Sequence, residues 1–361
     1  MAAIILATLL ILAISASTTK HGVLGQGALP GTNKALFIFG DSIYDAGNNV
    51  YEPKNSHINY YPYGKTYFKN PTGRVCDGRI IPDFIAEYMK MQFIKPYSLP
   101  GFTNYTDGAN FASSGSSVLP ENRPSSTHLA LQMKNFESVV SKIENEQGGK
   151  TANLLVSNAI YMISIGGNDY VDLPSNTSSA ARERMVARVI AALSSAVKKL
   201  HGRGARKFAF QNIGPLGCMP LMKNRAGSKG ECVYGLTVSA KMHNIALASL
   251  LKQLQSSLTG FSYSLYDVYT ALALRSRYPT KYGFKVGENA CCGSGTFNGL
   301  FTCGGQNGTV KYNLCSKPGE YVWFDAAHPT DETNKYLAES FWAGSSETVW
   351  PINLKALYEA I

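Results

Sequence analysis

The stretch "ALFIFGDSIYDAGNN", residues 35–49, decides the fold of this 361-residue chain. Its first residues form an apolar run that ends at Gly40, and Asp41 and Ser42 follow directly in a polar segment that contains glycine. A short apolar run bounded by turn residues predicts a buried strand. A serine at that place either caps the following turn or presents its hydroxyl at the mouth of a cleft.

The same pattern recurs along the chain. Apolar runs that end in turns stand in "AIYMISIGGND" (159–169), "KFAFQNIGPLG" (207–217) and "FSYSLYDVY" (261–269). Segments with helical spacing lie between or beside these runs, at about 127–147, 180–201 and 232–259. Repeated β-α-β units predict an α/β fold with a mostly parallel sheet covered by helices on both faces. Ligands bind such sheets at the carboxyl ends of the strands, where Ser42 and Asn168 would meet.

Composition excludes a disordered chain, because 45% hydrophobic and 16% charged residues are typical of a globular protein. The opening "MAAIILATLLILAISAS" is an apolar run followed by small residues. It predicts a signal peptide over residues 1–17, cleaved near 16–17, and a single domain over 18–361. No other segment approaches the length and apolarity of a membrane span, so we expect a soluble, secreted mature chain.

Cysteine usage agrees with secretion. Six of the seven cysteines lie in turn-rich, glycine-rich sequence of the C-terminal half: Cys218, Cys232, Cys291, Cys292, Cys303 and Cys315. They predict disulfides, with the pairing open and Cys76 left as a free thiol. A zinc site is disfavoured because no Cys-x-x-Cys and no histidine pair at ligand spacing occurs. Sequons make Asn104, Asn176 and Asn307 candidate glycosylation sites.

The formal net charge of +10 includes a local cluster of Lys198, Lys199, His201, Arg203, Arg206 and Lys207. The cluster could bind acidic polysaccharide or an anionic membrane, but cations also favour a helix C-terminus, and we prefer this second interpretation. A nucleic-acid partner is not expected, because no recognised binding motif occurs.

Three further motifs carry possible chemistry. In "FDAAHPT" (324–330) a carboxylate and an imidazole stand three residues apart, an arrangement that serves nucleophilic catalysis but also suits a helix N-terminus. In "IGGNDY" (165–170) Asn168 could donate to an oxyanion, or the four polar and glycine residues could simply form a turn. In "GANFASSGSS" (108–117) the Gly115 N–H is a further candidate donor. Each alternative is reasonable alone, but none explains the joint appearance of all four motifs in this order.

Together the motifs resemble the plant GDSL esterase/lipase family of the SGNH hydrolase superfamily, over essentially all of the mature chain. The resemblance implies a three-layer α/β/α sandwich with a flavodoxin-like central sheet. It implies Ser42 as nucleophile, with Asp325 and His328 as the other triad members. It also implies an oxyanion hole formed by Ser42, Gly115 and Asn168.

The chain departs from the family pattern at a few positions. Ile43 replaces the leucine that gives the family its name, a swap that conserves volume. Ser114 and Ser117 stand where glycines are common, which leaves open which N–H of that loop faces the oxyanion. Cys76 stands where serine is more usual.

The expected function is that of a secreted serine esterase or lipase that hydrolyses carboxylic esters through an acyl-enzyme, with no metal or organic cofactor. Its substrate would be a small-molecule or lipid ester, and its location the extracellular space of a plant, the apoplast or cell wall. One alternative is an acyltransferase that passes the acyl group to an alcohol. Another is a catalytically silent, defence-associated binding protein, which the intact set of five site residues disfavours.

Overall fold

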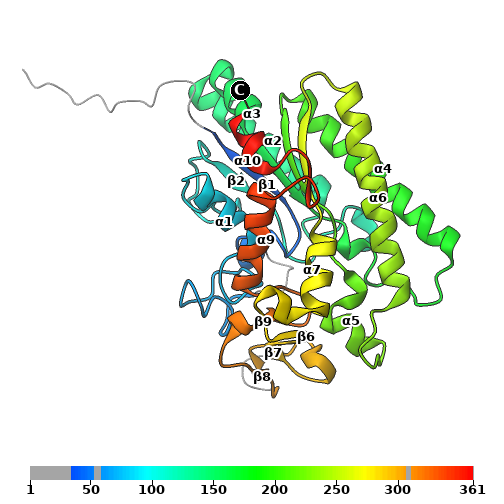
Figure 1. The fold of residues 1–361 in the computed structure, drawn as a ribbon. Coiled ribbons are helices and arrows are strands. Elements are labelled where there is room, and N and C mark those ends of the chain that lie inside the picture. The colour runs from blue at the N-terminus through cyan, green and yellow to red at the C-terminus, as the bar shows by residue number, and fades with distance from the viewer. Residues whose placement is uncertain (1–33, 53–57, 306–309, 361) are drawn as a thin grey trace, which may run out of the picture. The chain divides into compact units, whose positions relative to one another are not determined.

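Six strands form the central sheet of the computed structural model, in the order β10-β5-β4-β3-β1-β2 (Figure 1). The strands from β2 to β5 pair in parallel, and β10 pairs antiparallel with β5 at one edge. The order of β1 to β5 is flavodoxin-like, as expected. The strands are β1 Leu36–Gly40, β2 Gly108–Asn110, β3 Ile160–Ser164, β4 Lys207–Gln211, β5 Ser262–Tyr266 and β10 Val349–Pro351.

The structure describes residues 34–52, 58–305 and 310–360. The signal peptide over 1–17 and the sequon at Asn307 lie outside these residues, and so does the start of the domain predicted over 18–361. These three statements stay predictions.

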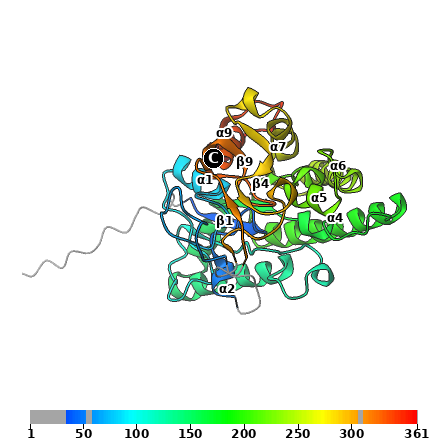
Figure 2. The ribbon, with the colours of Figure 1, turned by 90° about the horizontal axis from the view of Figure 1, so that it is seen from below.

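Helices cover both faces of the sheet, which confirms the predicted fold (Figures 1 and 2). One layer consists of α2 Leu129–Gln147, α3 Gly149–Asn158, α4 Ser179–Gly202 and α6 Tyr234–Ser257. The other contains α1 Ile81–Tyr88, α9 Asp331–Ala343 and α10 Leu354–Glu359, while α5 Pro220–Arg225 and α7 Val268–Arg277 follow β4 and β5. The helices predicted at 127–147, 180–201 and 232–259 correspond to α2, α4 and α6, with ends that differ by at most two residues.

Covering on both faces explains the apolar run in β1. All five of its residues are buried, because helices cover both faces of the sheet. The ring of Phe37 packs edge-on against Phe136 of α2 at 5.1 Å, and Phe39 stacks on Phe111 at 5.1 Å between ring centroids. The core therefore fixes β1 directly before the turn that holds Ser42.

Three disulfides are present: Cys218 to Cys232 encloses α5, while Cys291 to Cys315 and Cys292 to Cys303 tie the long excursion that precedes α9. In the excursion, β6 Val286–Ala290 pairs with β9 Tyr321–Trp323, and β7 Cys292–Gly293 pairs with β8 Asn313–Leu314. Cys76 is a buried free thiol. The disulfide prediction is confirmed, and the structure supplies the pairing that the sequence left open.

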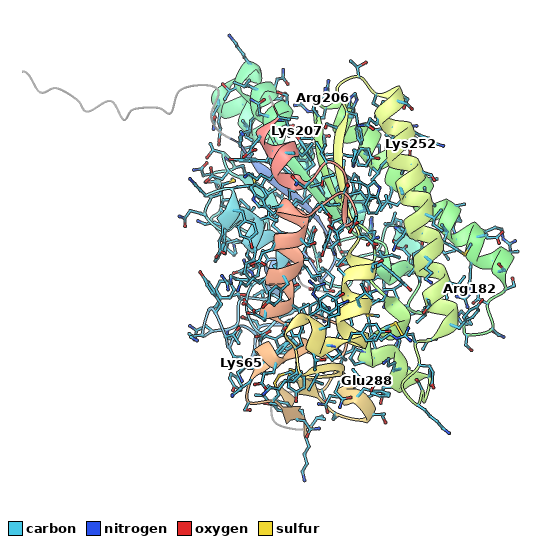
Figure 3. The ribbon with its side chains drawn as sticks, viewed as in Figure 1. Lys65, Arg182, Arg206, Lys207, Lys252 and Glu288 are labelled. Carbon is cyan, nitrogen blue, oxygen red and sulfur yellow. A yellow bond between two sulfur atoms is a disulfide. The ribbon has the colours of Figure 1, made fainter. Side chains whose placement is uncertain are left out.

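The basic cluster at the end of α4 lies far from this excursion, as the positions of Arg206, Lys207 and Glu288 in Figure 3 show. Several residues of the cluster form ion pairs or hydrogen bonds with neighbouring parts of the chain. Arg203 pairs with Glu144, and Arg206 donates to the backbone oxygens of His201 at 3.0 Å and of Ala205 at 2.8 Å. The helix-terminus interpretation fits these contacts.

Candidate active site

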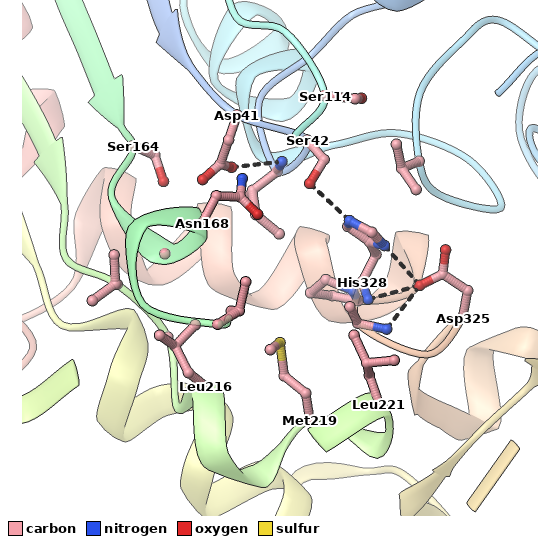
Figure 4. A pocket seen from close by; sticks show the side chains of 18 of the residues that line it. Asp41, Ser42, Ser114, Ser164, Asn168, Leu216, Met219, Leu221, Asp325 and His328 are labelled. Atoms are coloured by element: carbon pink, nitrogen blue, oxygen red, sulfur yellow. Dashed lines mark hydrogen bonds and ion pairs between the residues drawn. The ribbon is translucent and has the colours of Figure 1, made fainter. Parts of the chain in front are cut away.

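Ser42 lies in the turn that ends β1. The Asp41 N–H donates to the Ser164 oxygen at 3.2 Å, and the N–H groups of Tyr44 and Asp45 donate back to the Asp41 oxygen, which closes the turn. Glycine is required at position 40, because a Cβ there would stand 2.6 Å from the Ser164 oxygen. The close approach of two backbones thus aims Ser42 at a cavity beyond the sheet (Figure 4).

The side chains of Ser42, His328 and Asp325 form one hydrogen-bonded chain (Figure 4). The Ser42 hydroxyl donates to His328 Nε2 at 2.8 Å, and His328 Nδ1 donates to Asp325 Oδ1 at 2.7 Å. Asp325 is fully buried and His328 is 8% exposed. The structure therefore brings together three residues that are up to 286 positions apart in the chain.

The surroundings of Asp325 favour its ionised form. Burial alone would raise its pKa, but the charge of His328 and donors from His328, Ala327 and Tyr63 hold the pKa below its ordinary value. The N–H groups of Ala327 and His328 donate to Oδ1 at 3.0 and 2.9 Å, so the carboxylate also closes its own turn. A buried anion beside Nδ1 keeps the imidazole in the tautomer that can accept a proton at Nε2.

The candidate oxyanion donors face the same cavity as Ser42. Gly115 has a left-handed backbone with φ +80°, which glycine adopts readily. Its neighbours' N–H groups are taken, since Ser114 N donates to Asp45 and Ser116 N donates to the Ser113 oxygen. Within the described ranges, the N–H groups of Gly115 and Ser42 have no acceptor. This geometry favours Gly115 as the N–H that faces an oxyanion.

Asn168 lies in the short helical turn Gly167–Asp169 that follows β3. Its Nδ2 donates one hydrogen to the Ser116 oxygen at 2.9 Å, which orients the amide and leaves the second hydrogen for a ligand. Gly166, with φ +127°, opens the turn.

Buried residues that sequence reasoning missed hold these loops together. Asp45 accepts from the Gly47 and Asn48 N–H groups at 2.7 and 2.6 Å and from Ser114 N at 2.8 Å. Asp169 accepts from the Val118 and Leu119 N–H groups at 2.8 and 3.0 Å. Both carboxylates lie within the quoted motifs, so a signal was present, but the partners Ser114 and Val118 lie 69 and 51 residues away.

Gln132 of α2 is a third missed residue. Its side-chain oxygen accepts from Gly40 N at 2.9 Å, and its Nε2 donates to the Gly40 oxygen at 2.8 Å. This fully buried amide thus holds the backbone of Gly40 in place, two residues before Ser42. Gln132 lies on the buried face of α2 among apolar side chains, so no sequence motif indicates this role.

A cavity of about 560 Å³ adjoins the Ser42 hydroxyl. Its lining is mainly apolar and comes from the loops that follow several strands: Val171, Ile213, Leu216, Met219, Leu221, Met222 and Phe301. The ring of Phe301 lies 6.3 Å from the imidazole of His328, measured between centroids. Charged residues also line the cavity, and among them Arg123 and Arg225 both pair with Asp172. The cavity suits a ligand with an apolar body.

The described part of the chain contains no group of acidic, histidine or cysteine side chains that could hold a metal ion. Among its other histidines, His243 is buried and contacts the Tyr170 hydroxyl at 2.9 Å. Burial lowers the pKa of His243 to about 3, as suits a neutral core residue.

Comparison with known proteins now identifies the family. The model of the GDSL-like lipase/acylhydrolase family matches residues 36–341. The chain belongs to the GDSL lipase/acylhydrolase family. It is 40% identical to GDSL esterase/lipase 4 of Arabidopsis thaliana over 91% of each chain, and 41% identical to a GDSL lipase of Tanacetum cinerariifolium over 90% of this chain and 88% of that one. It is also 37% identical to an inactive GDSL esterase/lipase-like protein 25 of Arabidopsis thaliana, over 90% of this chain and 74% of that one.

The structure accommodates the departures from the GDSL pattern. The Ile43 N–H donates to Asp41 Oδ1 at 3.1 Å, and the Ile43 side chain packs against the core. The Ser114 hydroxyl donates to Asp45 at 3.0 Å, and the Ser117 hydroxyl donates to the Leu119 oxygen at 2.7 Å. Both serines therefore stabilise the loop that carries Gly115.

Proposed function

We propose that this GDSL family member is a secreted serine esterase or lipase that hydrolyses carboxylic esters through an acyl-enzyme on Ser42. The observation that carries the proposal is the continuous chain of hydrogen bonds from Ser42 through His328 to Asp325, at 2.8 and 2.7 Å, beside an apolar cavity. Membership in a family of lipases and acylhydrolases supports the same reaction.

In the first half of the proposed reaction, His328 Nε2 takes the proton of Ser42 as the hydroxyl oxygen attacks the ester carbonyl. Asp325 stabilises the imidazolium that forms. The N–H groups of Ser42 and Gly115 and the free amide hydrogen of Asn168 receive the oxyanion. His328 then gives its proton to the leaving alcohol, and the acyl group stays on Ser42.

In the second half, His328 Nε2 takes a proton from a water molecule that attacks the acyl carbonyl, and it returns the proton to the Ser42 oxygen as the bond from that oxygen to the acyl carbon breaks and the acid is released. An alcohol in place of water would make the protein an acyltransferase. The apolar lining of the cavity favours esters with an apolar acyl or alcohol part.

Secretion is part of the proposal. The apolar N-terminal segment and the three disulfides support it, because disulfides persist in oxidising compartments. No helix within residues 34–52, 58–305 and 310–360 has the length and apolarity to cross a membrane.

The test compares the secreted protein with a Ser42→Ala variant on short-chain and medium-chain p-nitrophenyl esters and on a fluorophosphonate probe. The proposal expects turnover and labelling in the parent protein only. Equal results in both proteins would refute it, and ester product formed with added alcohols would favour acyl transfer. Because one relative is named inactive, absence of turnover together with absence of labelling would support the silent alternative.

A further inference from the structure

Asp325 receives one hydrogen bond from far outside its own turn. Its Oδ1 accepts from the imidazole of His328 and from two backbone N–H groups nearby, whereas its Oδ2 accepts from the Tyr63 hydroxyl at 2.9 Å. Tyr63 lies 262 residues earlier in the chain. Within the described ranges, Tyr63 is the only side chain that donates to Oδ2.

The position of the Tyr63 ring is fixed from several sides. It is 2% exposed and meets the rings of Tyr60 and Phe324 edge-on, each at 5.4 Å between centroids. It belongs to a buried cluster with Cys291, Cys292 and Cys303 of the disulfide-tied excursion. The excursion in turn bonds to the catalytic turn, because the Cys292 N–H donates to the Phe324 oxygen at 2.7 Å.

The backbone around Tyr63 is also anchored. The Tyr63 N–H donates to the Tyr60 oxygen at 3.2 Å, and the Gly64 N–H donates to the Cys76 oxygen at 2.9 Å. A hydroxyl held this firmly can select one orientation of a carboxyl group. Without it, Oδ2 would lose this donor, and the plane of the Asp325 carboxylate could turn about the Cβ–Cγ bond and weaken the hydrogen bond that Oδ1 accepts from His328.

We propose that Tyr63 is a positioning residue for the reaction, which holds the Asp325 carboxylate in one orientation and limits its basicity toward His328. The inference rests on the proposed serine-esterase function. The Tyr63 hydroxyl donates to Asp325 and not to Ser42 or His328, so its effect passes through Asp325.

The direction of the electrostatic effect follows from the contact. A hydrogen bond to a carboxylate stabilises the anion, so its loss makes Asp325 more basic and lets the His328 imidazolium keep its proton to a higher pH. Burial and the nearby Asp325 raise the pKa of Tyr63 well above its ordinary value, so the phenol stays a donor. The other titratable groups that face this system are Tyr60 and Cys76 beside Tyr63, and Asp41 beside His328.

The experiment uses Tyr63→Phe, which removes only the hydroxyl. We expect kcat on a p-nitrophenyl ester to fall about tenfold with KM nearly unchanged, as misplacement of a catalytic group predicts. The acid limb of the pH profile should move upward by roughly half a pH unit. Tyr161→Phe is the matched control, because this buried tyrosine donates to the Val156 oxygen at 2.9 Å in the core of the sheet. It should leave kcat and the pH profile unchanged.

Two further measurements separate positioning from general loosening. In an Asp325→Asn background, Tyr63→Phe should no longer shift the pH profile, because the charge through which it acts is gone. The titration of the His328 ring, followed by NMR and assigned with His328→Asn, should show the same upward shift without any need for turnover.

The inference is overturned if Tyr63→Phe leaves the His328 titration where it was, or if its effect persists in the Asp325→Asn background. Absence of Ser42-dependent turnover in the parent protein would instead overturn the proposed function. The NMR titration measures the effect of Tyr63 on His328 in either case, so the two failures can be told apart.

Discussion

The Asp45→Asn substitution tests how the turn that holds Ser42 and the loop that carries Gly115 are coupled. The Asp45 carboxylate is fully buried and joins these two segments, since Oδ1 accepts from Gly47 and Asn48 while Oδ2 accepts from Ser114 and Asn49. An amide keeps the shape of the carboxylate but turns an NH2 group toward one of these two sets of donors. At least two hydrogen bonds to a buried anion are then lost.

Hydrogen bonds to charged groups contribute about 1.5 to 3 kcal/mol each, so the gross loss is about 3 to 6 kcal/mol. Burial raises the pKa of Asp45, which shows that the buried charge itself carries a cost that the amide avoids. We therefore expect the free energy of unfolding to fall by about 2 to 4 kcal/mol net. Because Ser114 directly precedes Gly115, kcat should also fall, by about tenfold or more.

Urea unfolding followed by circular dichroism measures the first effect, and ester hydrolysis measures the second. Asp267→Asn is the control for stability, because this helix-capping carboxylate accepts from Thr270 at 3.1 Å and from Asn212 at 2.9 Å through a single oxygen that an amide retains. Asparagine caps a helix about as well as aspartate, so its effect should stay within about 0.5 kcal/mol. If Asp45→Asn were equally mild and left kcat within a factor of two, the reasoning would be refuted.

Three other predictions concern the site and its supports. Asn168→Ala should lower kcat about 100-fold or more with little change in KM, measured by steady-state kinetics, because it removes a proposed oxyanion donor; an unchanged kcat would exclude that role. Burial raises the pKa of Asp77 to about 6, above its unfolded value near 3.8. Between these two pH values the folded chain binds a proton that the unfolded chain has lost. The free energy of unfolding should therefore fall as pH rises from about 4 to about 6. Asp77→Asn should remove this contribution, up to about 3 kcal/mol, in denaturation curves across that range, and identical slopes would contradict it. Replacing Cys292 and Cys303 with alanine should lower the unfolding free energy by about 2 to 4 kcal/mol, and a loss under about 0.5 kcal/mol would show that the bridge constrains little.

Much of the fold could be predicted because its signals are local. The four short apolar runs became β1, β3, β4 and β5, since strands covered on both faces favour apolar sequence. β2 and β10 gave no such signal: each has three residues, and β10 includes Pro351 and depends on pairing with a distant strand.

The residues of the candidate site likewise fall into those with a local sequence signal and those without one. Ser42, Asn168 and the pair Asp325 and His328 each stand in a recognisable local motif, and the structure brings them to one cavity. Tyr63 has no motif that relates it to Asp325, because only folding brings the two together.

The most direct test of the account is to trap the acyl-enzyme. The protein is mixed with an activated ester, quenched in acid within the first turnover and digested, and the adduct is located by mass spectrometry. The account predicts one acyl group on Ser42, absent from His328→Ala quenched at the same time. An adduct on another residue, or turnover without any adduct on Ser42, would contradict it.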